Sequence, residues 1–284
     1  MAIGYVLYNP LAGDGSCKLS AQALGILLPD ELVFSDMTKT DFYEQTLFDL
    51  QPEDYIVLCG GDGTLNRFIN ITEGVDIRNK IYYLPAGTGN DFAKDLGKTP
   101  QDIPFEINNY IKDLPQVNVH GRTIRFLNGV GYGLDGYCCQ VGDEMRAKGK
   151  KKVNYTAIAI KGLLFHYKPT NARVTVDGVR YNFKKVWLAP TMHGRYYGRG
   201  MIPTPNQDRN APEQTLSCMI MHGTGKLRTL MIFPSIFKGE HIRHQKAVKI
   251  LTGKEIRVQF DRPVALQIDG ETLLRVTEYT ATAG

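Results

Sequence analysis

The stretch Gly60-Gly61-Asp62-Gly63-Thr64-Leu65-Asn66 decides how the first half of this chain is expected to fold. An apolar run at residues 55–59 precedes it and predicts a buried strand, and apolar residues at helical spacing follow it. A strand that ends in a Gly-Gly turn and restarts as a helix is typical of a phosphate site, because the glycines allow close approach and the helix N-terminus directs free N–H groups at an anion. Asp62 would repel a bare phosphate, so we expect it to address a metal ion, a substrate hydroxyl or a proton.

The first third of the chain alternates between strand-like and helix-like segments. Strands are expected at residues 3–8, 31–34, 55–59 and 81–84, and helices at residues 17–28 (capped by Ser16), 41–50 (capped by Thr40), 90–96 and 103–111. Helices between short apolar strands favour an α/β fold, here a Rossmann-like nucleotide-binding domain with a parallel sheet covered on both faces. Ligands of such sheets bind at the carboxyl ends of the strands.

From about residue 118 the pattern changes to short strands separated by turn residues. Strands are expected at residues 122–127, 172–176, 184–188, 216–221, 247–251, 255–260 and 264–268, with a turn at residues 261–263, and helices at residues 154–165 and 227–237. This pattern predicts a C-terminal β-rich domain, an antiparallel sandwich or a barrel-like sheet. The expected domains are therefore residues 1–118 and 119–284, with the last residues able to return and pack on the first domain.

The composition limits the function classes. The formal net charge of +5 permits contact with anionic membranes or nucleotides but does not demand it, and no repeating pattern of basic and aromatic residues indicates nucleic acid. The five cysteines form no CxxC pair and are odd in number, which favours reduced thiols in a cytosolic protein. His222, His241 and His244 are interpreted as surface or packing residues rather than a zinc site.

Three glycine-bearing loops are expected at one edge of the first sheet, because each follows a strand. They are residues 9–16, residues 60–66 and Gly87-Thr88-Gly89-Asn90-Asp91-Phe92-Ala93. Together they would form a pocket sized for a nucleotide, although each loop alone could equally be a tight turn that needs glycine. The chain contains no GxxxxGK[ST] motif and no GxGxxG after its first strand, which disfavours a P-loop ATPase and an ordinary dinucleotide dehydrogenase.

These loops resemble the motifs of the diacylglycerol kinase catalytic-domain family, which includes bacterial lipid kinases and sphingosine kinases and is distantly related to NAD kinases. The resemblance continues in order through residues 128–135, 197–201, 238–241 and 267–271, so it covers nearly the whole chain. It implies a nucleotide-binding domain followed by a β-rich lipid-substrate domain, with ATP and Mg²⁺ as cofactors. It also implies transfer of the γ-phosphoryl group of ATP to a lipid hydroxyl.

The resemblance also implies roles for particular residues. Those expected to bind the nucleotide or line the cleft beside it are Asn9, Gly13, Gly61, Asp62, Gly63, Thr64, Thr88, Asn90, Asp91 and Glu271. Asp62 and Asp269 are the expected catalytic residues, and the same two would hold Mg²⁺ through water or phosphate. One of them would be the general base that takes the proton of the alcohol and the other a metal or water orienter; the sequence does not decide which. Taken alone, Asp269-Gly270 predicts a hairpin turn.

Several alternatives stay open. Diacylglycerol is the default acceptor, giving phosphatidic acid, and a sphingoid base, a polyprenol or a soluble metabolite are the alternatives. Outside enzymes, the alternative is a non-catalytic nucleotide- or lipid-binding regulator. The chain departs from the family pattern at Arg199, which interrupts a glycine run, and at residues 210–217, where an aspartate-rich loop is usual. A structural metal near residues 206–217 is therefore in doubt.

The expected partners besides ATP and the lipid alcohol are an anionic membrane, contacted peripherally, and a second copy of the chain. The apolar residues 157–165 and the basic residues 146–152 are the segments that could rest on the membrane. The expected location is cytoplasmic, peripheral to the inner membrane surface. A homodimer would pair through an edge strand of the second domain.

Overall fold

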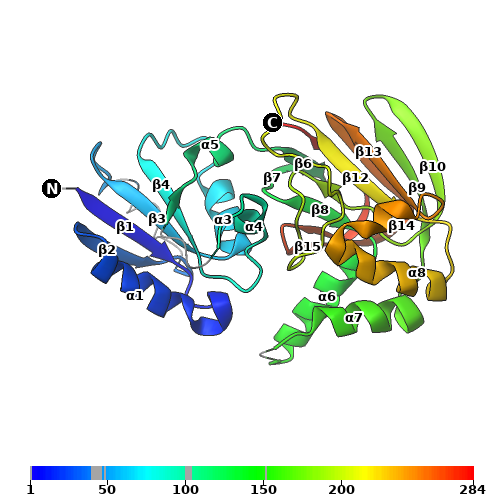
Figure 1. The fold of residues 1–284 in the computed structure, drawn as a ribbon, viewed down its shortest axis with the longest axis horizontal. Helices are drawn as coiled ribbons and strands as arrows, with labels where there is room; N and C mark the ends of the chain where they lie inside the picture. The colour runs from blue at the N-terminus through cyan, green and yellow to red at the C-terminus, as the bar shows by residue number, and fades with distance from the viewer. Residues whose placement is uncertain (1, 40–46, 48, 100–103, 151) are drawn as a thin grey trace. The chain divides into compact units, whose positions relative to one another are not determined.

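The computed structural model describes residues 2–39, 47, 49–99, 104–150 and 152–284. The chain forms two compact units, Met1–Asp113 and Leu114–Gly284, and each contains its own sheet (Figure 1). The first unit is an α/β structure with a mostly parallel sheet, and the second is an antiparallel β-rich structure. The predicted fold class is thereby confirmed.

The sheet of the first unit has five strands in the order β2-β1-β3-β4-β5. Strands β1 to β4 are parallel, and β5 pairs antiparallel with β4. The strands are β1 (Ile3–Tyr8), β2 (Glu31–Asp36), β3 (Tyr55–Gly60), β4 (Lys80–Pro85) and β5 (Phe105–Glu106). The helices are η1 (Ala12–Gly15), α1 (Cys17–Leu27), α3 (Asp62–Ile71), α4 (Asp91–Asp95) and α5 (Asn108–Ile111).

Helices cover both faces of this sheet, because alternate residues of a strand point to opposite sides. Cys59 of β3 and its neighbour Leu84 of β4 face α1 and share a core with it. Tyr83, one residue earlier in β4, points to the other face and meets Phe92 of α4, with ring centroids 6.0 Å apart. Strands buried on both faces explain the continuous apolar runs in the sequence.

One predicted helix of the first unit is wrong in part. Within the expected helix at residues 103–111, Phe105 and Glu106 instead form β5 and pair with β4, and only α5 is helical. The Phe105 ring packs edge-on against Tyr83, with centroids 5.8 Å apart, so a contact with the sheet outweighs the local helical spacing. Of the expected helix at residues 41–50, residues 41–46 and 48 lie outside the described residues.

The second unit is built on a ten-stranded sheet in which β13-β12-β11-β8-β14-β15-β6-β7 follow one another, while β9 pairs with β10 and β14. Its strands are β6 (Gln116–Val119), β7 (Arg122–Arg125), β8 (Gly129–Tyr132), β9 (Thr170–Val176), β10 (Val179–Val186), β11 (Thr191–Met192), β12 (Leu216–Met221), β13 (Val248–Gly253), β14 (Glu255–Ile268) and β15 (Glu271–Thr282). Its helices are α6 (Leu134–Ala147), α7 (Tyr155–Lys161), η2 (Gly162–His166), α8 (Lys226–Ile232), η3 (Phe233–Lys238) and η4 (Glu240–Arg243).

The turn predicted at residues 261–263 is wrong, because β14 runs through it as one strand. Its pairing with β15 shifts register between Gln259 and Val264, which marks a bulge. Pro263 lies within this irregular stretch, where the missing N–H of proline costs no regular ladder bond. The part of β14 before the bulge pairs with β9 and the part after it pairs with β8, so the bulge redirects the strand between two neighbours.

The second unit has two apolar cores. One lies within the sheet and includes Tyr132 of β8 stacked on Phe260 of β14, with ring centroids 3.8 Å apart. The other joins α6, α7, η2 and α8 to β12. Among the helices of the described residues, none has both the length and the apolar character needed to cross a membrane.

Candidate functional site

The three glycine-bearing loops of the first unit meet at the carboxyl edge of its sheet. The backbone N–H of Asn9 donates to the carbonyl of Cys59 at 3.2 Å, and that of Ala86 donates to the carbonyl of Gly60 at 2.7 Å. The side-chain amide of Asn9 also lies 3.4 Å from the hydroxyl of Thr64. Since β1, β3 and β4 are neighbours in the sheet, the loops that follow them are fastened in a row.

The loops approach so closely that two positions exclude any side chain. A Cβ atom built on Gly87 would overlap the Cα atom of Gly61, and one on Gly13 would overlap the carbonyl oxygen of Ala86. Gly13 also has φ = 60°, in the left-handed region that favours glycine. Gly13 and Gly87 are therefore required by the mutual contact of the loops, whereas a Cβ atom on Gly63 would meet nothing within 4 Å.

Gly87→Ala tests this contact. The new methyl group meets backbone atoms, which cannot move aside singly, so we expect overpacking to cost about 1–3 kcal/mol of stability and to separate the second and third loops. If the loops bind nucleotide, ATP affinity should fall by roughly tenfold or more. Thermal unfolding and a nucleotide titration measure the two effects.

The matched control is Gly25→Ala on α1, where a Cβ atom meets nothing within 4 Å. This control should unfold at the same temperature as the wild type or slightly above it, because alanine favours a helix. A Gly87→Ala protein with unchanged stability and unchanged nucleotide affinity would contradict the importance of the loop contact.

Asp62 fastens the second loop to the third. Its two carboxylate oxygens accept the backbone N–H groups of Asp91 and Phe92, each at 2.9 Å, at the start of α4. The residue itself lies in the first turn of α3, where the partial positive charge of the helix end stabilises a carboxylate. The acid of the GGDGT motif therefore joins the N-terminal ends of two helices.

Asn90 closes the third loop on itself. Its side chain accepts the N–H of Gly87 at 2.9 Å and donates to the carbonyl of the same residue at 2.8 Å. It adopts φ = 52°, a left-handed conformation that asparagine tolerates, and it is buried. The structure thus places Asn90 as a residue that shapes the loop.

The other expected ligands of this unit differ in exposure. Gly63 and Thr88 are exposed, and Asn9, Gly13 and Gly61 are partly exposed, so these positions can be reached by a ligand. Thr64 and Asp91 are buried, and the Lys94 ammonium lies 3.8 Å from an oxygen of Asp91.

Asp269 belongs to the second unit, in the turn between β14 and β15. Asp269 and Gly270 have φ values of 46° and 101°, as a two-residue hairpin with two left-handed central positions requires, so the predicted hairpin turn is present. The Asp269 carboxylate accepts three backbone N–H groups, those of Leu127 at 2.5 Å, Asn128 at 2.9 Å and Gly129 at 3.0 Å. Glu271 lies exposed at the start of β15.

Two residues that the sequence did not single out hold the same segment. A ring nitrogen of His193 lies 2.9 Å from the carbonyl oxygen of Leu127, and Arg209 donates to the side-chain oxygen of Asn128 at 2.9 Å. Residues 127–129 are therefore held by an acid, an imidazole and a guanidinium from three distant parts of the chain. Arg209 lies beside the loop that departs from the family pattern, which was the one signal that could have drawn attention to it.

Asp135 is the most perturbed acid of the second unit. It is buried at the start of α6, where it accepts the backbone N–H of Gly136 at 3.0 Å and the hydroxyl of Tyr197 at 3.2 Å. Burial, which disfavours the charged carboxylate, raises the pKa of Asp135 to about 6, and these hydrogen bonds oppose that shift. The sequence contained this residue in a motif but assigned it no role.

We expect the raised pKa of Asp135 to make the protein lose stability as pH rises from about 4 to 6. The folded state holds the proton more tightly than the unfolded chain, whose Asp pKa is about 4, so the stabilisation is complete below pH 4 and is lost as pH rises through the folded pKa. The loss amounts to roughly 3 kcal/mol. Denaturant unfolding of the wild type and of Asp135→Asn across this range measures it: the difference between the two should depend on pH, and a constant difference would contradict the shift.

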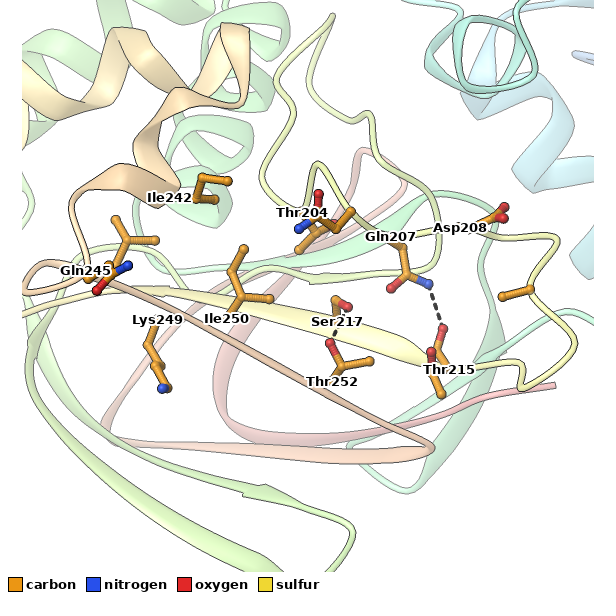
Figure 2. A pocket seen from close by; sticks show the side chains of 13 residues that line it. Thr204, Gln207, Asp208, Thr215, Ser217, Ile242, Gln245, Lys249, Ile250 and Thr252 are labelled. Carbon is orange, nitrogen blue, oxygen red and sulfur yellow. Dashed lines mark hydrogen bonds between the residues drawn. The ribbon is translucent and has the colours of Figure 1, made fainter.

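A cavity of about 640 Å³ lies within the second unit, between the loop at residues 204–215 and strands β12 and β13. Figure 2 shows hydroxyl and amide side chains around it: Ser217 bonds Thr252 at 2.8 Å, and Gln207 donates to the carbonyl of Thr215 at 2.7 Å. The cavity includes part of the segment where the structural metal was in doubt. Within the described residues no three His, Cys, Asp or Glu side chains gather as a metal cluster.

Comparison with known families accounts for both units. Residues 4–119 match the family model described as the diacylglycerol kinase catalytic domain. Residues 128–281 match the model described as the YegS C-terminal NAD kinase beta sandwich-like domain.

Individual proteins show the same similarity. A diacylglycerol kinase of Mycobacterium tuberculosis (strain ATCC 25618 / H37Rv) is 28% identical over 196 residues, which cover 66% of this chain and 62% of that protein. A diacylglycerol kinase of Bacillus subtilis (strain 168) is 25% identical over 228 residues, covering 78% and 72%. The match thus spans less than two thirds of the length of the mycobacterial relative.

Solved structures share the fold. A structure from Bacillus anthracis strain Sterne superposes with a TM-score of 0.67 at 21% identity, covering 98% of this chain and 91% of that one. Another from the same strain, described as a diacylglycerol kinase, gives a TM-score of 0.60 at 19% identity, covering 99% and 94%.

Proposed function

Because this chain belongs to the diacylglycerol kinase catalytic-domain family and carries its YegS-type C-terminal domain, we propose that it is an ATP-dependent lipid kinase. The reaction transfers the γ-phosphoryl group of ATP to the hydroxyl of a lipid, with diacylglycerol as the default acceptor and phosphatidic acid as the product. The observation that carries the proposal is the junction of three glycine-bearing loops at the carboxyl edge of the first sheet, where such sheets bind ligands.

The phosphates of ATP would lie against these loops. The exposed Gly63 lies in the first turn of α3, whose backbone N–H groups and partial positive charge suit an anion. Asn9, Gly13, Gly61 and Thr88 are the other reachable positions. Thr64, Asn90 and Asp91 would act by holding the loop shape, because each is buried.

Asp62 lies at this edge and fits Mg²⁺. Kinases commonly hold this ion with one or two carboxylates together with the substrate phosphates, and Asp62 offers such a carboxylate in the second loop. Bound Mg²⁺ would neutralise the charge that develops on the transferred group. The role of the protein is to hold the phosphoryl donor and the acceptor alcohol in line with one another.

The attacking alcohol must give up a proton, and we propose that Asp62 or Asp269 accepts it while the other carboxylate orients a metal or water ligand. Both side chains are pre-oriented by backbone N–H groups. Catalysis that depends on the positioning of reacting groups requires such a fixed geometry.

We propose that the enzyme works in the cytoplasm, peripheral to the inner membrane surface, because its lipid acceptor resides in the bilayer. A homodimer is a further part of this proposal. β13 ends the order of strands in the second sheet, and an edge strand can pair with a second copy.

The experiment that tests the function incubates the protein with [γ-³²P]ATP, Mg²⁺ and a total lipid extract, and identifies the labelled product. A labelled lipid that co-migrates with phosphatidic acid supports the default acceptor. A labelled sphingoid or polyprenyl phosphate would support another lipid alcohol. ATP binding without any labelled product would support the non-catalytic regulator instead.

A further inference from the structure

Four large apolar side chains of the second unit lie exposed on two neighbouring helical segments. The exposed fractions are 39% for Ile160, 74% for Phe165, 73% for Leu227 and 74% for Met231. Ile160 belongs to α7, Phe165 to the π-helical turn η2, and the other two to α8. We call these four side chains the apolar patch.

Two members of the apolar patch, Phe165 and Leu227, lie near one another because η2 and α8 are in contact. The Lys226 ammonium donates to the carbonyl of Leu164 at 2.6 Å. Leu227 follows Lys226 and Phe165 follows Leu164, so these two apolar residues lie near this hydrogen bond. Leu227 and Met231 are four residues apart on α8 and therefore share a face. Figure 1 shows α7 and α8 within the second unit.

The four side chains of the apolar patch are not needed to fill the helical core. The buried face of the same segments already carries Ile158, Leu163 and Ile232, which are at most 8% exposed and pack into the helical core. The apolar patch is therefore additional to the core, and an exposed patch of this kind marks a contact surface.

The chain segments that carry the apolar patch are basic in sequence. Residues 145–176 and 214–239, which contain the whole patch, hold eleven lysines and arginines and no aspartate or glutamate. The formal net charge of the entire chain is only +5, so the remainder of the chain is net negative. Lys161, Lys226 and Arg228 are exposed beside the apolar side chains.

We propose that the apolar patch and its surrounding basic residues form the surface by which the second unit docks on an anionic lipid bilayer. Exposed aromatic and aliphatic side chains on a helix enter the boundary between headgroups and acyl chains, and nearby lysines and arginines are attracted to anionic headgroups. The inference rests on the proposed function in one respect: a lipid kinase must reach a bilayer to find its acceptor. It assigns the contact to α7, η2 and α8.

The test is sedimentation of the full chain with phosphatidylcholine vesicles, with and without phosphatidylglycerol, in the absence of ATP. We expect binding that requires phosphatidylglycerol and weakens as salt is added. The double variant Leu227→Ser/Met231→Ser should bind about tenfold more weakly or worse, because it removes buried apolar contact with the bilayer. Lys161→Gln/Arg228→Gln should lower the affinity and its salt dependence.

The matched control is Val179→Ser/Leu274→Ser, which removes two side chains of similar exposure, 55% and 54%, from strands β10 and β15. It should bind vesicles like the wild type. All variants should unfold at about the wild-type temperature, since each replaced side chain is exposed.

The outcomes separate this inference from the proposed function. Phosphorylation of a water-soluble short-chain diacylglycerol, measured without vesicles, tests the kinase alone. Vesicle binding that depends on the patch in a protein with no such activity would leave the docking surface standing and overturn diacylglycerol as the acceptor. A wild type that ignores anionic vesicles, or a Leu227→Ser/Met231→Ser variant that binds as tightly as the control, would overturn the docking surface whatever the activity.

Discussion

Asp62→Asn is expected to lower the ATP-dependent phosphorylation rate by about 100-fold or more. The substitution removes the negative charge that would hold Mg²⁺ or accept the proton of the alcohol. It also disturbs the clamp on α4, because the asparagine amide group cannot accept one of the two N–H groups that the carboxylate receives. Initial rates at saturating ATP and lipid measure the loss.

The structural part of this effect can be separated from the chemical part. Leaving a backbone N–H group without its acceptor costs about 1–3 kcal/mol of stability, and thermal unfolding measures this loss. Asp76→Asn is the matched control, because Asp76 is an exposed acid of the same unit that pairs with Arg78 at the surface, and it should keep wild-type rates. A folded Asp62→Asn protein with a rate close to that of Asp76→Asn would remove Asp62 from the mechanism.

Asp269→Asn is expected to cause a comparable loss of rate together with a loss of stability. The backbone N–H groups of Leu127, Asn128 and Gly129 all donate to the Asp269 carboxylate, so its loss releases three consecutive residues. An asparagine at position 269 keeps the left-handed conformation of the hairpin but presents an N–H group where an acceptor is needed. Rates and thermal unfolding of the purified variant measure both effects.

The pH dependence of kcat/KM distinguishes the roles of the two acids. The variant that lacks the general base should lose the fall in rate at acid pH, because no base is left to be protonated, while the other variant should keep it. Glu255→Gln, which changes an exposed acid of the strand β14 that leads into this hairpin, is the control and should behave as the wild type. Wild-type rates in a folded Asp269→Asn protein would confine Asp269 to a structural role.

Much of the fold follows from the sequence because its strands are apolar and short. The parallel strands of the first unit and strand β12 occur where the patterns predict them. The long strand β14 was split into two, since Pro263 and its polar neighbours resemble a turn and only the pairing of β14 with β8, β9 and β15 shows a bulge.

The helix α6 was not predicted from the sequence, because two glycines interrupt its helix-forming residues. Gly136 and Gly142 lie within it. A Cβ atom on Gly136 would overlap the carbonyl oxygen of Ala265, and one on Gly142 would lie 2.8 Å from the ring of Tyr155. These glycines permit close packing of α6 on β14 and α7, so tertiary contact outweighs propensity.

The candidate site was predictable in position and less so in role. The order strand, glycine loop, helix places residues 9–16, 60–66 and 85–91 at one edge of the sheet. The sequence could not show that the side chains of Asp62 and Asn90 bond backbone groups. The Asp62 contacts join residues distant in the chain, and the Asn90 contact depends on a left-handed conformation. Nor could it show that Asp269 both forms the hairpin turn and accepts backbone N–H groups of the segment at residues 127–129.

The most direct measurement is a crystal structure of the protein grown with ADP and Mg²⁺. The account predicts the diphosphate within hydrogen-bond distance of backbone N–H groups in the loops that follow β1, β3 and β4, with the exposed Gly63 at the phosphates. A nucleotide bound at another place, with its phosphates away from these three loops, would contradict it.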